Sequence, residues 1–185
     1  MNKCKISRYI LLMLMLLLIC STSINALEVT LSSPIQSDGL SYIDNDFGFV
    51  VTFTPRNHNS AYLNQFSMKL DNYSQSNIRI IWDNCAYVDY NNVTSKLFHT
   101  PKKGILGNAD VANKDDSMPP TLIPAGASLI EYLMSANNLK WNGFHWQPLP
   151  FFPVLKNVKG QSMAFILCFE KDSIQKTTTF QFTVK

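Results

Sequence analysis

Short segments in which apolar and polar residues alternate recur along most of the chain. In residues 27–33 (LEVTLSS), Leu27, Val29 and Leu31 alternate with polar residues. This period of two is typical of a strand with one buried and one solvated face. Similar alternation, or runs of aromatic and β-branched residues, predicts strands in residues 47–53, 66–70, 78–82, 163–169 and 178–184. The run at 163–169 is almost entirely apolar, which predicts a central strand.

Turn-forming sequences separate these segments. The stretches DNYSQSN (71–77), DYNN (89–92) and EKDS (170–173) consist of residues that favour turns. Many short strands joined by such turns predict an all-β fold, specifically an immunoglobulin-like antiparallel β-sandwich. Asn72 and Asn92 each begin an N-x-Ser/Thr sequon, but the signal and composition are typical of a bacterium, so both are interpreted as turn residues.

One segment, ASLIEYLMSANNL (127–139), fits a helix as well as a strand. It contains apolar pairs four residues apart, Leu129 with Leu133 and Ile130 with Met134. Ser128 followed by Glu131 would form a helix capping box. We therefore expect either a short helix near 128–136 or a strand, and neither outcome would change the fold class.

Two long segments lack a regular pattern. Residues 99–124 are polar and include the pair Pro119-Pro120, and connections of this length are either simple links or binding loops. Residues 141–153 (WNGFHWQPLPFFP) combine aromatic residues with prolines, which indicates an edge or a crossing loop.

Aromatic side chains in the second segment are the candidate binding residues. Exposed rings can stack on sugars or anchor a protein interface. The candidates are Trp141, Phe144, His145 and Trp146. The alternative interpretation is that these large residues close the open end of the sandwich.

The N-terminus has the layout of a secretory signal peptide. Lys3, Lys5 and Arg8 precede an uninterrupted apolar run from Tyr9 to Cys20, and small and polar residues follow. A membrane-spanning helix needs roughly 20 apolar residues, so this run is short for a retained anchor. We predict that residues 1–26 are a cleaved signal and that the protein is exported.

The cleavage site has three candidates. Signal peptidase would cut after Ala26 or after Ser23, each with a small or apolar residue two places before it. Cleavage before Cys20 would produce a lipoprotein held on a membrane by that residue. Ile19 precedes Cys20, where lipoprotein signals usually carry Gly, Ala or Ser, so Cys20 is a candidate lipidation site or simply the end of the apolar run.

Removing the signal changes the charge of the chain. The full sequence has 16 Lys and Arg, 13 Asp and Glu and a formal net charge of +3. The signal holds three of the basic residues and no acidic residue, so residues 27–185 are formally neutral. A neutral chain offers no basic patch for nucleic acid. Residues 27–185 suit a single β-sandwich domain with its own core.

Two cysteines, Cys85 and Cys168, remain after the signal. In an oxidising compartment they would be paired as a disulfide. The alternative is two buried free thiols that act as small apolar residues. Neither belongs to a C-x-x-C motif or lies near a histidine in the sequence, so a metal site is not indicated.

Groupings that would indicate an enzyme are absent from the sequence. No G-x-S-x-G motif surrounds a serine. The histidines His58, His99 and His145 lie far apart, and so do Glu28, Glu131 and Glu170. We predict no catalytic residues.

Metal sites are also not indicated. Asp44 and Asp46 lie in DNDFG, which is similar to the start of a calcium loop but lacks the later ligands, so both are interpreted as solvated turn residues. His99 with His145 or a methionine would suit copper or zinc, but no spacing brings them together. We predict no metal and no cofactor.

One longer pattern resembles a loose family of exported bacterial envelope proteins of unassigned role. The stretch IRIIWDNCAYVDYNNVTSKLFHT and the later PPTLIPAGASL carry it, over roughly residues 60–185. The matching positions are Ile78, Ile80, Trp82, Asp83, Asp89, His99, Pro119, Pro120, Ile123, Pro124 and Gly126. The resemblance implies an envelope protein, often a lipoprotein, with a β-sandwich core. It implies structural roles: Trp82 in the core, Asp83 bonding a turn and Gly126 as a hinge.

These observations together favour an exported, non-catalytic envelope protein that acts as an accessory or interaction module. Its partner would be an envelope protein or a cell-wall glycan, and it would meet a membrane only through its signal or a lipid anchor. The first alternative is a carbohydrate- or cell-wall-binding module that uses Trp141 and Trp146. The second is a small periplasmic enzyme that uses His99 with Asp83 or Asp89.

Overall fold

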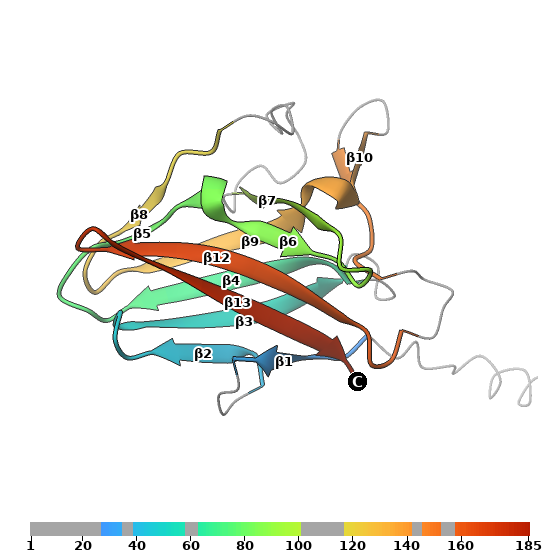
Figure 1. Ribbon diagram of the computed structural model, residues 1–185, viewed down its shortest axis with the longest axis horizontal. Coiled ribbons are helices and arrows are strands. Elements are labelled where there is room, and N and C mark those ends of the chain that lie inside the picture. The colour runs from blue at the N-terminus through green and yellow to red at the C-terminus, as the bar shows by residue number, and fades with distance from the viewer. Residues whose placement is uncertain (1–26, 35–38, 58–62, 101–116, 142–145, 153–157) are drawn as a thin grey trace, which may run out of the picture.

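The computed structural model describes residues 27–34, 39–57, 63–100, 117–141, 146–152 and 158–185 (Figure 1). Within these residues it contains strands and two short 3-10 turns, and no α-helix. The strands are β1 (Val29–Ser33), β2 (Ser41–Asp44), β3 (Phe49–Asn57), β4 (Leu63–Asn72), β5 (Ile78–Ile80), β6 (Ala86–Val88), β7 (Thr94–Thr100), β8 (Thr121–Ile123), β9 (Ser128–Ser135), β10 (Leu139–Trp141), β11 (Trp146–Pro148), β12 (Ser162–Lys171) and β13 (Ile174–Val184). The 3-10 turns are η1 (Trp82–Asn84) and η2 (Ala136–Asn138).

Most strands belong to one antiparallel sheet that is nearly closed into a barrel. Its order is β1-β13-β12-β6-β7-β9-β4-β3-β2, and β5 and β8 extend from β12 beside this path. The two strands at the ends of this order, β1 and β2, lie close to each other in Figure 1, and the Leu31 N–H donates to the Gly39 carbonyl just before β2 (2.8 Å). The all-β prediction is confirmed. Since the sheet continues through β6 and β7, the immunoglobulin-like sandwich stays a prediction.

Phenylalanine rings fill the interior between β3, β4, β12 and β13. The buried rings are Phe49, Phe53, Phe66, Phe165, Phe169, Phe180 and Phe182. Phe66 meets Phe165 edge-on with centroids 5.2 Å apart, and Phe53 meets Phe182 at 5.1 Å. Such pairs add about 0.5–1.5 kcal/mol each beyond the burial of their area. The alternating positions of these strands thus build one aromatic core.

The predicted strands fall on observed strands. The apolar run at 163–169 lies in β12, which pairs with β13 on one side and with β5 and β6 on the other, so its central position is confirmed. In β13, Phe180, Phe182 and Val184 are buried while Gln181 is exposed, as the alternation predicts. The predicted strand 78–82 ends earlier, at Ile80, because Trp82 begins η1.

Of the two alternatives for residues 128–136, the helix is wrong and the strand is confirmed, because residues 128–135 form β9. It pairs with β4 over residues 128–133 and with β7 over residues 132–135. Glu131 and Leu133 point to the buried side, and Ile130 is exposed. Backbone bonds to two neighbouring strands outweigh a local spacing that also suits a helix.

The two sequon asparagines differ in their surroundings. Asn92 is exposed and has a positive φ of 62° in the β6–β7 turn, as expected of a turn residue. Asn72 is buried at the end of β4. Its side-chain nitrogen lies within hydrogen-bond distance of the carbonyls of Ser76 (2.9 Å), Ile123 (3.1 Å) and Pro124 (3.0 Å). Asn72 therefore fixes the turn before β5 against the end of β8.

Candidate functional site

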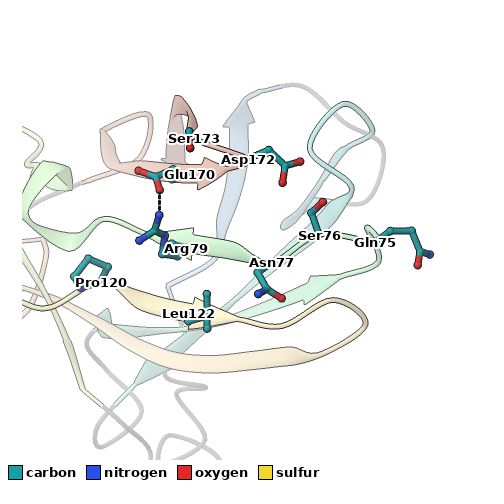
Figure 2. A pocket seen from close by; sticks show the side chains of 9 residues that line it. All are labelled: Gln75, Ser76, Asn77, Arg79, Pro120, Leu122, Glu170, Asp172 and Ser173. Atoms are coloured by element: carbon teal, nitrogen blue, oxygen red, sulfur yellow. Dashed lines mark hydrogen bonds and ion pairs between the residues drawn. The ribbon is translucent and has the colours of Figure 1, made fainter.

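A groove on the outer surface of the sheet lies over β5, β8 and the end of β12 (Figure 2). Its volume is about 750 Å³, which falls within the range of small-ligand sites. The residues that line it are Gln75, Ser76, Asn77, Arg79, Pro120, Leu122, Glu170, Asp172 and Ser173. The lining is thus polar and charged, with an apolar strip from Pro120 and Leu122.

The floor of the groove is a row of three side chains from neighbouring strands. Arg79 of β5 pairs in register with Glu170 of β12 on one side and with Leu122 of β8 on the other. Ile78 and Ile80 are buried on the opposite face of β5, so the period of two places Arg79 outside. Arg79 is ion-paired with Glu170, as the dashed line in Figure 2 shows.

Glu170 is held from two sides. Besides Arg79, the Gln175 side chain donates to its second carboxylate oxygen (3.0 Å). The Glu170 side chain is 14% exposed, whereas that of Arg79 is 50% exposed. Arg79 bonds Glu170 through one terminal nitrogen, so its other N–H donors remain available to a ligand.

Two turns form the walls of the groove. One contains Gln75, Ser76 and Asn77 and is anchored by Asn72, and the Asn77 side chain accepts from the Ala125 N–H (3.2 Å). The other is the Asp172-Ser173 turn between β12 and β13. Since each wall is a turn tied to the sheet, the groove is a fixed feature of the fold.

A second cluster of chemically active side chains lies at the border of β7 and β9. His99 Nδ1 lies 3.4 Å from Glu131 Oε2, and the side chains are only 15% and 6% exposed. The Trp82 ring stacks on the His99 ring with centroids 3.9 Å apart and planes 12° from parallel. Neither His99 Nδ1 nor Glu131 Oε2 has a hydrogen bond of regular geometry within the described part of the chain. Neither residue lines the groove.

The acids expected to meet His99 are engaged elsewhere. Asp89 accepts from the N–H groups of Asn91 and Val93 and closes its own turn (both 2.8 Å). Asp83 accepts from the Met118 N–H (2.9 Å) and from Ser117. The backbone bond from Met118, then the Ser117 bond, lowers the pKa of Asp83. Pairing His99 with Asp83 or Asp89 is therefore wrong, because Glu131 is the acid beside it.

Trp82 and Asp83 fit the structural roles implied for them. Trp82 is fully buried, and its indole N–H donates to the Thr121 hydroxyl (2.8 Å). Together with the bonds to Asp83, this fixes η1 against residues 117–121. Gly126 has a φ of +71°, a conformation that favours glycine in its turn.

The two cysteines are free thiols and are not joined as the predicted disulfide. Both are buried, and the Cys168 N–H donates to Cys85 Sγ (3.3 Å). Cys85 in turn donates to the Ile81 carbonyl (3.3 Å). Burial raises the pKa of the Cys85 thiol to about 12. The alternative of two small buried residues fits this arrangement.

Asp44 is not the solvated turn residue that its sequence suggests. It is buried, accepts from the Phe47 N–H (3.0 Å) and is paired with Lys176 of β13 (2.6 Å). Burial alone would raise the pKa of Asp44, but the bonds from Lys176 and Phe47 outweigh it and the pKa lies below its usual value. Asp46 is exposed, as expected.

The side chains of the four predicted aromatic binding residues lie outside the described part of the structure. Phe144 and His145 lie outside the described residues, as do Cys20, His58 and the signal segment 1–26. The backbones of Trp141 and Trp146 pair with each other in the β10–β11 hairpin, but their side chains are outside the description. In the described ranges, no three His, Cys, Asp or Glu side chains gather as metal ligands.

Comparison with known proteins leaves the chain without an assigned family. No family model matches it, and no curated protein is significantly similar. Among the described residues, no helix is long and apolar enough to cross a bilayer. The groove therefore has to be interpreted from its own chemistry. Sequence reasoning missed it, although the charged residues Arg79 and Glu170 within apolar strands were a usable signal.

Proposed function

We propose that this chain is an exported, non-catalytic envelope protein that acts as an interaction module built on an immunoglobulin-like sandwich. Its groove over β5, β8 and β12 would hold a segment of a partner protein. The row of Leu122, Arg79 and Glu170 carries this proposal, because it places an exposed apolar side chain directly beside a fixed ion pair. The resemblance to exported envelope proteins agrees with it.

The exposed apolar surface supports binding of a protein segment. Leu122 is 53% exposed, whereas its neighbour in β8, Ile123, points to the other face and is buried. Protein interfaces typically combine an apolar centre with a polar rim. Here Leu122 and Pro120 would supply the centre, and the hydroxyl, amide and charged groups of the walls would supply the rim.

The composition of the lining favours a protein over a glycan. Sugar rings bind best against exposed aromatic faces, and no aromatic side chain is among the described residues that line the groove. The glycan-binding alternative depends on Trp141 and Trp146 and stays a prediction.

The His99–Glu131 pair is the one observation that bears on the second candidate, a small enzyme. A histidine beside a carboxylate is the arrangement of a general base and its orienting acid. However, Trp82 covers one face of the ring and both side chains are largely buried, which suits a structural pair better. Non-catalytic binding is therefore the function that the geometry supports best.

Site-specific photocrosslinking in the native host tests the partner. A photoreactive phenylalanine analogue replaces Leu122 in one variant and Val93, which is 50% exposed in the β6–β7 turn, in the control. We expect a protein adduct from position 122 only. The purified partner should then bind L122D at least about tenfold more weakly than wild type or V93D. Adducts from both positions, or equal binding to all three proteins, would argue against the groove.

An intact mass measurement tests export. The protein from the envelope fraction should lack its signal, and its mass distinguishes cleavage after Ser23, after Ala26 or before a lipidated Cys20. Recovery of the full-length chain from the cytosol would contradict the proposal.

A further inference from the structure

The turn that forms one wall of the groove has an unusual backbone for its residues. Lys171 pairs with Ile174, so Asp172 and Ser173 alone make the connection from β12 to β13. Both have positive φ, 50° and 65°. Two-residue hairpin turns of this kind strongly favour asparagine or aspartate followed by glycine. Serine at the second position therefore adopts a backbone conformation that glycine would adopt at lower cost.

The negative charge of Asp172 is uncompensated in the described part of the chain. The Asp172 carboxylate has no ion pair or hydrogen bond there, and Figure 2 shows it directed toward the opposite wall, where Ser76 and Asn77 lie. The nearby cations are engaged elsewhere. Lys171 donates to the Phe47 carbonyl (2.8 Å), and Lys176 is paired with Asp44.

The remaining charges of the groove cancel. Arg79 and Glu170 form an ion pair, so the described residues of the lining have a formal charge of −1 that is located at Asp172. Ser76, Asn77 and Ser173 add neutral hydroxyl and amide oxygens to the same lining, and that of Asn77 also accepts from the Ala125 N–H. This is a suitable environment for an ammonium or guanidinium group, which needs acceptors on several sides.

We propose that the Asp172-Ser173 turn binds a lysine or arginine side chain of the partner segment, whose apolar neighbours rest on Leu122. This inference depends on the proposed function, since it assumes that a protein segment occupies the groove. Beyond that function, a positively charged side chain is the feature by which the groove would select the segment.

Peptide sub-libraries test the charge preference. The full mature protein is immobilised, and random heptapeptides whose central residue is fixed as Lys, Arg, Gln or Glu are passed over it. We expect Lys and Arg peptides to be retained about three- to fivefold more strongly than Gln peptides, and Glu peptides least. The preference should decrease as NaCl rises from 50 to about 500 mM.

Charge reversal provides the decisive comparison. D172K should invert the preference toward Glu peptides, while E28K makes the same kind of change at an exposed residue outside the groove and should leave it unaltered. If peptides are retained without a charge preference, or with one that D172K does not change, the inference of a basic segment is overturned. The proposal that the groove binds a protein segment would still stand in that case. If no sub-library is retained, or if L122D retains peptides as well as V93D, the proposed function fails as well.

The S173G variant distinguishes a binding role of the Ser173 side chain from its effect on stability. S173G relieves the left-handed backbone and should raise the Tm by about 2–4 °C. If the serine hydroxyl helps to hold the cation, the same variant should retain Lys peptides about twofold less. A higher Tm with unchanged retention would remove Ser173 from the site.

Discussion

Nδ1 of His99 lies 3.4 Å from Oε2 of Glu131, both side chains are largely buried, and the His99 ring stacks on the fully buried Trp82. A buried carboxylate requires a compensating partner, because desolvation of a charge is costly. Removing His99 would leave the more deeply buried Glu131 carboxyl without its polar neighbour, whereas His99 without Glu131 would still stack on Trp82. This asymmetry gives a prediction for single substitutions.

Replacing His99 should destabilise the protein more than replacing Glu131. We expect H99L to lower the free energy of unfolding by about 3–5 kcal/mol, because it leaves the carboxylate unpaired. E131Q keeps a polar group of the same shape and should cost about 1–3 kcal/mol. Urea unfolding of both variants and of the double mutant measures their coupling. The exposed pair Glu28–Lys185 is the control, and E28Q should stay within about 0.5 kcal/mol of wild type.

The Asp44–Lys176 pair should make stability depend on acidity. The pKa of Asp44 is below its usual value of 3.8 in the folded protein, because bonds from Lys176 and Phe47 outweigh burial. The stabilisation is therefore complete above that value and is lost as the pH falls through the lower folded pKa. K176M should remove it. The difference in unfolding free energy between wild type and K176M should be constant at neutral pH and shrink below about pH 4. A difference that is flat down to pH 2 would contradict this account.

The two thiols should be unreactive in the folded protein. With the Cys85 pKa raised to about 12 by burial, only about one molecule in ten thousand carries a Cys85 thiolate at pH 8. In the folded mature chain, Ellman's reagent should label neither Cys85 nor Cys168 within minutes. In guanidinium, which unfolds the protein, it should label both rapidly. Rapid labelling without denaturant would disagree with their burial. An absence of labelling after unfolding would show that they are joined.

Gly48 should tolerate alanine worse than Gly39 does. Both have positive φ, 78° and 74°, so alanine pays a similar backbone penalty at each. A Cβ at Gly48 would lie 2.7 Å from Ser74 Cβ, whereas nothing lies within 4 Å at Gly39. We expect G48A to be less stable than G39A by about 1–3 kcal/mol in urea unfolding. Equal effects would show that the β4–β5 turn can move away.

Local pattern sufficed for most of the strands, because alternation reports directly which face is buried. Phe180, Phe182 and Val184 are examples. It failed at residues 128–135, where the spacing suits two structures and only the neighbours β4 and β7 decide between them. Trp82 ended a strand early for a similar reason, since its indole is held by Thr121, 39 residues away.

The candidate sites were harder to predict, because each depends on strand register. Arg79 meets Glu170 only through the pairing of β5 with β12, 91 residues apart. His99 meets Glu131 across β7 and β9, whereas the acids nearer to it in the sequence, Asp83 and Asp89, bond their own surroundings. Asp44 looked like a solvated turn residue because Lys176, its partner, lies in the last strand.

The buried position of Asn72 has a practical consequence for producing this protein. Oligosaccharyltransferase attaches its glycan to the side-chain nitrogen of a sequon, and this nitrogen is enclosed by three carbonyls at the junction of β4 and β8. A yeast or mammalian secretion host would meet the Asn72-Tyr73-Ser74 sequon before the chain folds. A sugar added at that moment would prevent the junction from forming, and substitution of Asn72 would remove the same bonds. A bacterial strain, which leaves this asparagine unmodified, is therefore the suitable production host.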